Sequence, residues 1–81
     1  MKDALPQKIV RAVIEQLMEA RKKKGLSHEK VAQLSNLHRS SISLIEAGKV
    51  QPTLLTLLKI SAALDTDLSG FLKLAEKGAK R

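Results

Sequence analysis

The sequence of 81 residues contains no cysteine, tryptophan or tyrosine, and it has a single phenylalanine, Phe71. Without cysteine, neither a disulfide framework nor a zinc site with thiolate ligands can stabilise the fold. The core must therefore be aliphatic, and a domain of this size buries about 60–65% of its unfolded surface. No apolar run approaches the roughly 18–20 residues of a membrane span, and no signal-peptide pattern begins the chain. We expect a soluble, cytoplasmic protein.

Acidic residues are also scarce, because 15 lysines and arginines stand against 8 aspartates and glutamates, which leaves a net charge of +7. Such an excess favours polyanionic partners, nucleic acid first and an anionic membrane surface second. The stretch "RKKKG" at residues 21–25 motivates the membrane alternative. Glu15 and Glu19 interrupt the basic face of that segment, so we expect nucleic acid and no membrane.

The spacing of apolar residues predicts five helices, and strand patterns are absent. The chain is therefore expected to be an all-α single domain over residues 1–81, with helices at about 6–24, 28–35, 39–47, 54–64 and 68–77. Gly25 and Gly48 suit positions just beyond helix ends, and Asn36 tolerates the left-handed backbone of a tight turn. Ser27 and Thr53 are good N-caps for the helices that follow them.

The expected third helix, residues 39–47, has two different faces. At ~100° per residue, Ile42 and Ile45 lie on one side, together with Glu46. The other side carries Ser40, Ser43, Leu44 and Ala47. Short side chains let a large partner approach the backbone closely, and hydroxyls can donate to phosphates or base edges. Taken alone, this strip fits a DNA-facing helix and an ordinary surface helix equally well.

Residues 20–72 resemble the lambda-repressor-like helix-turn-helix family, the Cro/XRE type of DNA-binding repressors. Arg21 precedes "KGLS", Ala32 follows in the second helix, and "NLHRSSIS" forms the turn and the start of the third helix. Next come "IEAGK", Pro52 and "TLLTLLKISAAL". The resemblance implies a compact five-helix domain whose second and third helices form the helix-turn-helix. It also implies sequence-specific binding to double-stranded DNA and transcription regulation, with residues 39–47 in the major groove.

The resemblance also implies roles for charged residues at this surface. His28 occupies a position at which relatives usually have a glutamine that contacts phosphate, and a histidine would make that contact partly dependent on pH. A solvent-exposed His28 without a ligand is the alternative. Arg39 would read guanine by a bidentate contact, or would hold a phosphate instead. Lys49, in the loop after the third helix, is suited to phosphate.

The remaining side chains of the third helix would complete the DNA contact. Ser40 and Ser43 could bind either bases or the backbone, and Ser41 faces sideways, toward phosphate or the protein interior. Leu44 would be an apolar contact for a thymine methyl group. Arg21 and Glu46 match the internal ion pair of the family, which would hold the third helix in place rather than touch DNA.

Two leucines depart from the family pattern, because Leu34 and Leu55 lie where charged residues are common. They could complete a thin core or contact a partner protein. The helix at 54–64 is apolar nearly all round, so more than one side must be covered. The helix at 68–77 could cover part of it and a second subunit the rest, which predicts a homodimer through these two helices on an inverted repeat. Alternatively, a lengthened first helix could cover the helix at 54–64 within a monomer.

Other function classes receive less support from the sequence. An antitoxin-type or other protein-interaction module would keep the same fold and use Leu34 and Leu55 as its site. An enzyme is not expected, because the two histidines have no nearby carboxylate cluster and no glycine-rich phosphate loop is present. His28 and His38 alone make a poor metal site, so we expect no metal and no cofactor. No effector domain is recognisable in the sequence, so a small-molecule effector is not expected.

Overall fold

The computed structural model describes residues 5–79, in which five α-helices and no strand are found. The helices are α1 (Leu5–Lys23), α2 (His28–Ser35), α3 (Arg39–Glu46), α4 (Leu54–Ala63) and α5 (Leu68–Ala79). The all-α class with five helices is as predicted, and the largest boundary difference is at α5, which continues two residues beyond the expected residue 77. Residues 1–4 and 80–81 of the predicted domain lie outside the described residues.

Each of the first four helices ends at a residue in the left-handed conformation. These residues are Gly25 (φ 68°), Asn36 (φ 58°), Gly48 (φ 77°) and Asp65 (φ 55°). In every case the N–H of the residue after the left-handed one donates to the carbonyl five positions earlier. The N–H of Leu26, for example, donates to the carbonyl of Arg21 at 3.1 Å. The left-handed residue itself donates to the carbonyl three positions earlier. This pair of hydrogen bonds is the Schellman motif, which satisfies the last carbonyls of a helix. The sequence predicted the first three of these ends, but not Asp65.

The predicted N-caps of α2 and α4 are present. Ser27 Oγ accepts the N–H of Lys30 at 3.0 Å, and Thr53 Oγ1 accepts the N–H of Thr56 at 3.1 Å. Each such cap contributes about 1 kcal/mol. His38 stands at the N-cap of α3 and makes no side-chain cap bond, so that end of α3 has free backbone donors.

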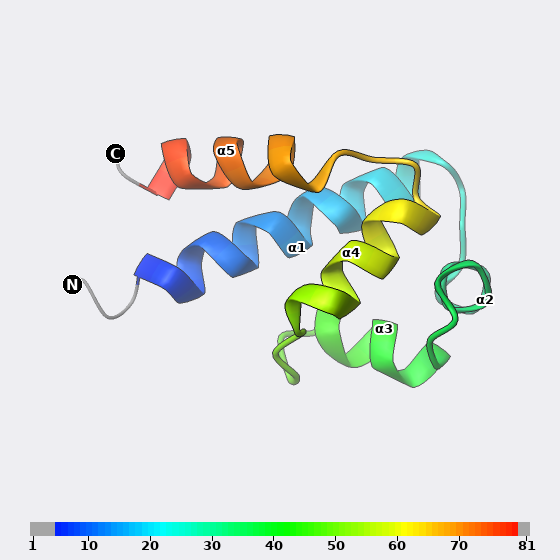
Figure 1. Ribbon diagram of the computed structural model, residues 1–81. Helices are drawn as coiled ribbons and strands as arrows, with labels where there is room; N and C mark the ends of the chain where they lie inside the picture. The colour runs from blue at the N-terminus through cyan, green and yellow to red at the C-terminus, as the bar shows by residue number, and fades with distance from the viewer. Residues whose placement is uncertain (1–4, 80–81) are drawn as a thin grey trace.

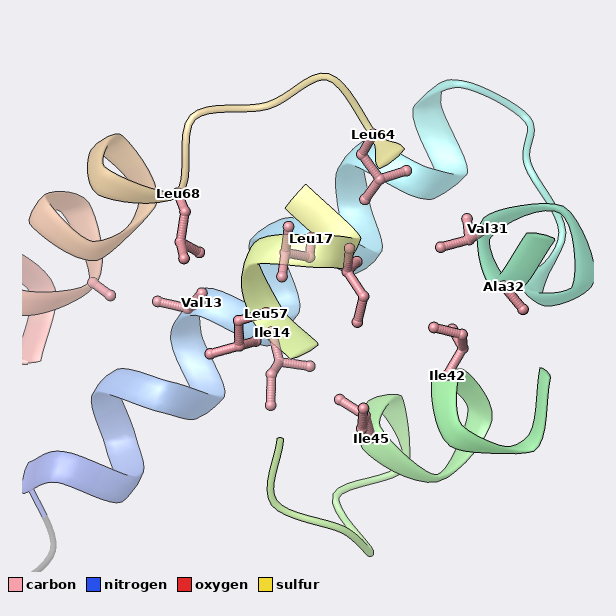
Figure 2. Close-up of a cluster of buried hydrophobic side chains, with 12 residues drawn as sticks. Val13, Ile14, Leu17, Val31, Ala32, Ile42, Ile45, Leu57, Leu64 and Leu68 are labelled. Atoms are coloured by element: carbon pink, nitrogen blue, oxygen red, sulfur yellow. The ribbon is translucent and has the colours of Figure 1, made fainter. Parts of the chain in front are cut away.

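The helices pack around one apolar cluster (Figure 1, Figure 2). α1 and α5 run side by side in opposite directions, and α2 packs against both α3 and α4 (Figure 1). Every helix contributes to the core, whose members are Val13, Ile14, Leu17, Val31, Ala32, Ile42, Ile45, Leu57, Ile60, Leu64, Leu68 and Ala75. None of these side chains is aromatic, as the composition required. No helix within residues 5–79 is both long enough and apolar enough to cross a bilayer.

Helix α5 covers only a small part of α4. Helix α5 packs chiefly along α1 and only slightly against α4, and Gln16 Nε2 of α1 donates to the Phe71 carbonyl of α5 at 3.0 Å. Consequently Leu54, Leu55 and Leu58 of α4 are 63%, 62% and 48% exposed. The alternative, cover of α4 by a lengthened α1, is wrong for these three leucines, because they remain exposed in the folded chain.

Candidate nucleic-acid interface

The orientation of α3 follows from its two isoleucines. Ile42 and Ile45 are 2% and 3% exposed, and Figure 2 shows both pointing from α3 into the core. The opposite face is turned to solvent, where Ser40, Ser43, Leu44 and Ala47 are all exposed. The strip of short side chains therefore forms an outer surface of the protein.

Helix α2 packs closely against α3 and holds it in position. Ala32 and Ser35 of α2 are buried, and their small side chains allow the two helices to approach each other. The Ser35 hydroxyl donates to the Val31 carbonyl at 2.6 Å, so its burial leaves no polar group without a partner. The left-handed Asn36 then turns the chain sharply into α3.

Basic groups stand at both ends of the outer face. Arg39 is the first residue of α3 and is exposed, and Lys49 is exposed in the loop that follows the helix. Ser41 is half-buried at the side of α3. Because His38 does not cap the helix with its side chain, the first N–H groups of α3 are available to an anion. The predicted contact residues of α3 and the following loop therefore lie along a single solvent-facing helix and its ends.

A bidentate ion pair joins α1 to the end of α3. Arg21 Nε lies 2.8 Å from Glu46 Oε2, and Arg21 Nη2 donates to Glu46 Oε1 at 2.9 Å. Both side chains are only 13% exposed. The remaining Nη1 group donates to the Leu26 carbonyl at 2.9 Å, which also ties the loop before α2. Arg21 and Glu46 are the two residues that the family resemblance implied as an internal pair.

His28 makes a contact that the sequence did not predict. Its Nε2 atom lies 2.9 Å from Glu46 Oε1, so one carboxylate receives partners from both α1 and α2. Burial alone raises the pKa of Glu46, but the hydrogen bonds and charges of Arg21 and His28 outweigh it, and the pKa lies below its ordinary value of 4.5. Glu46 is therefore an ionised carboxylate at neutral pH, held between three helices.

The His28 contact joins residues 18 positions apart, and no local spacing rule indicates it. A signal was nevertheless present. If Arg21, close before α2, pairs with Glu46 at the end of α3, then the first residue of α2 must lie near the same carboxylate. The imidazole remains 34% exposed, so the contact with Glu46 does not remove His28 from the protein surface.

Leu34 and Leu55 do not complete the core. They are 51% and 62% exposed, so that expectation is wrong for both. The core is already closed by Val31 and Ile60 on the inner faces of the same helices. Within residues 5–79, no group of three histidine, cysteine or acidic side chains is arranged to hold a metal ion.

Comparison with known proteins agrees with this geometry. A helix-turn-helix family model matches residues 17–71, which is more than half of the chain. The chain is 43% identical over 61 residues to the HTH-type transcriptional regulator PuuR of Escherichia coli (strain K12), and to the regulator of the same name in Shigella flexneri. That match covers 75% of this chain but 33% of those proteins.

An uncharacterized HTH-type transcriptional regulator of Haemophilus influenzae is 38% identical over 58 residues, which covers 72% of this chain and 59% of that protein. The chain thus spans about a third of the length of the PuuR proteins it matches. The matched region contains α2, α3, the turn between them and the Arg21–Glu46 pair. The chain belongs to the lambda-repressor-like helix-turn-helix family.

Proposed function

We propose that this chain is a sequence-specific regulator of transcription that binds double-stranded DNA as a homodimer on an inverted repeat, with α3 in the major groove. The observation that carries the proposal is the outer face of α3. That face is exposed and free of long charged side chains between its two basic ends, so a duplex can approach the helix backbone. The family membership and the printed names of the relatives support the same function.

The roles of individual residues follow from their positions. Arg39 lies at the N-terminal end of α3, where side chains of a recognition helix reach base edges, and it would pair bidentately with guanine. Ser40 and Ser43 supply hydroxyls along the same face, and Leu44, 40% exposed, offers an apolar surface to a thymine methyl group. Ser41, at the side of the helix, is assigned to phosphate.

Phosphate contacts would come from both flanks of α3. Lys49 follows the helix, and His28 begins the neighbouring α2. Each phosphate neutralised by the protein adds about −0.9 to the slope of log affinity against log salt. The net charge of +7 agrees with a partner whose binding depends strongly on salt.

The test begins with selection of bound duplexes from a random pool. Binding of the selected duplex, followed by fluorescence anisotropy, should weaken steeply between about 50 and 200 mM salt. Arg39→Ala should weaken it roughly 5- to 150-fold for each half-site, since a bidentate base contact is worth about 1–3 kcal/mol. Lys73→Ala is the matched control, because it removes one positive charge from exposed α5 and should leave affinity nearly unchanged. Binding that ignores both salt and Arg39→Ala would contradict the proposal.

A second substitution separates the two roles open to Arg39. Arg39→Lys keeps the charge but lacks the planar fork of the guanidinium group. If Arg39 reads guanine, the lysine variant should accept other bases at one position of the selected site. If Arg39 holds a phosphate, affinity should change by a similar factor for all sequences and the selected site should stay the same.

The proposed dimer uses the exposed leucines of α4. Leu54, Leu55 and Leu58 lie within one and a half turns of that helix, and Leu74 of α5 is 62% exposed. An apolar stripe of this kind on a folded chain marks an interaction surface. A second copy is the favoured partner, because one recognition helix reads only a few base pairs and a dimer presents two helices about 34 Å apart.

Sedimentation equilibrium tests the dimer directly. Leu58→Glu should give monomers, and it should weaken binding to a two-half-site duplex much more than binding to a single half-site. Leu34→Glu introduces the same charge at an exposed leucine of α2 and should leave the dimer intact. A wild-type chain that stays monomeric at micromolar concentration, or a Leu58→Glu dimer, would refute this arrangement.

Exposed Leu34 also supports a second candidate, an antitoxin-type module that binds a partner protein. It lies on α2, and an apolar side chain that is 51% exposed there is not needed by the core. Under this alternative, purification from the native cells would yield a stoichiometric complex with a small protein, and Leu34→Glu would abolish that complex while DNA affinity stays the same.

A further inference from the structure

The two ring nitrogens of His28 have different surroundings. Nε2 lies 2.9 Å from Glu46 Oε1 and faces an ionised carboxylate. A carboxylate only accepts hydrogen bonds, so Nε2 must carry a proton whether the ring is neutral or charged. The neutral imidazole is thereby confined to the tautomer with its proton on Nε2.

The other nitrogen, Nδ1, is open to solvent. It has no hydrogen-bond partner among residues 5–79, and it is not a buried atom left without a partner, since Arg11 Nη1 alone has that status in the described part of the chain. In the neutral tautomer Nδ1 presents a lone pair, which repels an anion. In the protonated ring it presents an N–H, which can donate to one.

Charged groups face the ring from three helices. Glu46 of α3 favours the imidazolium, whereas Arg21 of α1, which shares that carboxylate, opposes it. The N-terminal end of α2, where His28 lies, also opposes a positive charge. Along its own segment His28 is flanked by Lys24, Glu29 and Lys30. An anion brought to Nδ1 would add a second negative charge beside the ring and would favour the imidazolium further.

We propose that His28 binds a DNA phosphate through Nδ1–H only when its ring is doubly protonated, so that each subunit takes up a proton at His28 as it binds the duplex. This inference rests on the proposed function, because it requires α2 to lie against the DNA backbone. Glu46 is the reason for the linkage: by fixing the proton on Nε2, it removes the neutral form that could donate from Nδ1. Without Glu46, a neutral ring could place its proton on Nδ1 and make the same contact at any pH.

The expected effect is a fall in affinity as the pH rises. Histidine changes charge in the near-neutral range, and one linked proton changes affinity by up to tenfold per pH unit for each subunit. Tight binding therefore belongs to the acidic side of the titration and is lost toward the alkaline side.

The experiment measures affinity for the selected duplex between pH 6 and 8.5 at constant ionic strength. His28→Gln keeps a donor for Glu46 but cannot titrate. Its log affinity should therefore fall less steeply with pH than that of the wild type, by up to one log unit per pH unit for each subunit. His38→Gln replaces the only other histidine and should keep the wild-type slope. Equal slopes for wild type and His28→Gln would overturn the proposal.

A second measurement keeps the test independent of how well the variants fold. Nitrogen chemical shifts of the ring in the free wild-type protein at pH 8.5 should show the Nε2–H tautomer of His28, whereas an Nδ1–H tautomer would overturn the inference. The two proposals also fail differently. Absence of salt-dependent duplex binding even at pH 6 refutes the proposed function and this inference with it, while tight binding that is flat with pH refutes the inference alone.

Discussion

Replacing Glu46 by glutamine tests the contacts that hold the C-terminal end of α3 in place. The substitution keeps the side-chain shape but leaves the Arg21 guanidinium, 13% exposed, without its countercharge. Removing one partner of a buried ion pair costs about 3–5 kcal/mol. Here Arg21 keeps its bond to the Leu26 carbonyl, and the amide oxygen can still accept one N–H. We therefore expect the free energy of unfolding to fall by about 2–3 kcal/mol.

The assay is urea unfolding followed by circular dichroism, with a thermal scan beside it. For a domain of this size each kcal/mol lowers the melting temperature by about 4–8 °C, so the loss should be roughly 8–24 °C. Glu15→Gln is the matched control, because it breaks the Arg11–Glu15 pair, whose side chains are 40% and 63% exposed. An exposed pair of this kind contributes at most about 0.5 kcal/mol.

The effect of Glu46 should also depend on pH with a definite sign. Its pKa in the folded state lies below the ordinary value of 4.5, so the ionised form stabilises the fold. The stability difference between wild type and Glu46→Gln is thus complete above the ordinary pKa, and it shrinks as the pH falls through the lowered folded pKa. A difference below about 0.5 kcal/mol at pH 7, or one that grows on acidification, would refute the reasoning.

Three further predictions concern the helix ends and the core, each measured by urea unfolding. Asp65→Gly should raise stability by roughly 0.5–1 kcal/mol, because Asp65 holds φ 55°, a conformation that glycine adopts without strain; no gain would contradict the strain argument. Gly48→Ala should lower it by about 1 kcal/mol through φ 77° alone, since an added Cβ would meet its nearest neighbour at an ordinary 3.6 Å. Ile42→Ala should cost about 2–5 kcal/mol, the usual range for a fully buried position, whereas Leu55→Ala, at an exposed leucine, should cost well under 1 kcal/mol.

Local rules predicted the helices well because each boundary carries its own residue signal. Gly25 and Gly48 stand where only a residue free of a Cβ takes the left-handed conformation without cost, and both hold it. Asp65 adopts the same left-handed conformation at the end of α4. Aspartate is common in many kinds of loop, however, so its residue type alone does not identify a left-handed position. The Ser61–Thr66 hydrogen bonds that surround it are visible only once the turn is folded.

Burial was harder to predict than helix position, for a physical reason. The isoleucines of α3 alternate with serines, so periodicity separated the inner face from the outer one. In α4 both faces are apolar, and a leucine that awaits a partner has the same composition signal as a core leucine. Leu57 is 8% exposed and Leu55 is 62% exposed, although a single turn of helix carries both. Only the packing of the neighbouring helices, chiefly α2, decides which of the two is covered.

The candidate site combines two restraints on α3 that act at different places. Burial of Ile42 and Ile45 fixes the rotation of the helix about its axis, and the Arg21–Glu46 pair fixes its C-terminal end against α1. Arg39, at the other end, has no side-chain contact of this kind within residues 5–79 and is left free for a ligand. Perturbing the two ends should therefore have different effects on DNA binding. Glu46→Gln should weaken binding to all duplexes by a similar factor, because it loosens the whole helix, whereas Arg39→Ala should change which base is preferred. Selected sites that shift with Glu46→Gln and stay constant with Arg39→Ala would reverse this assignment of roles.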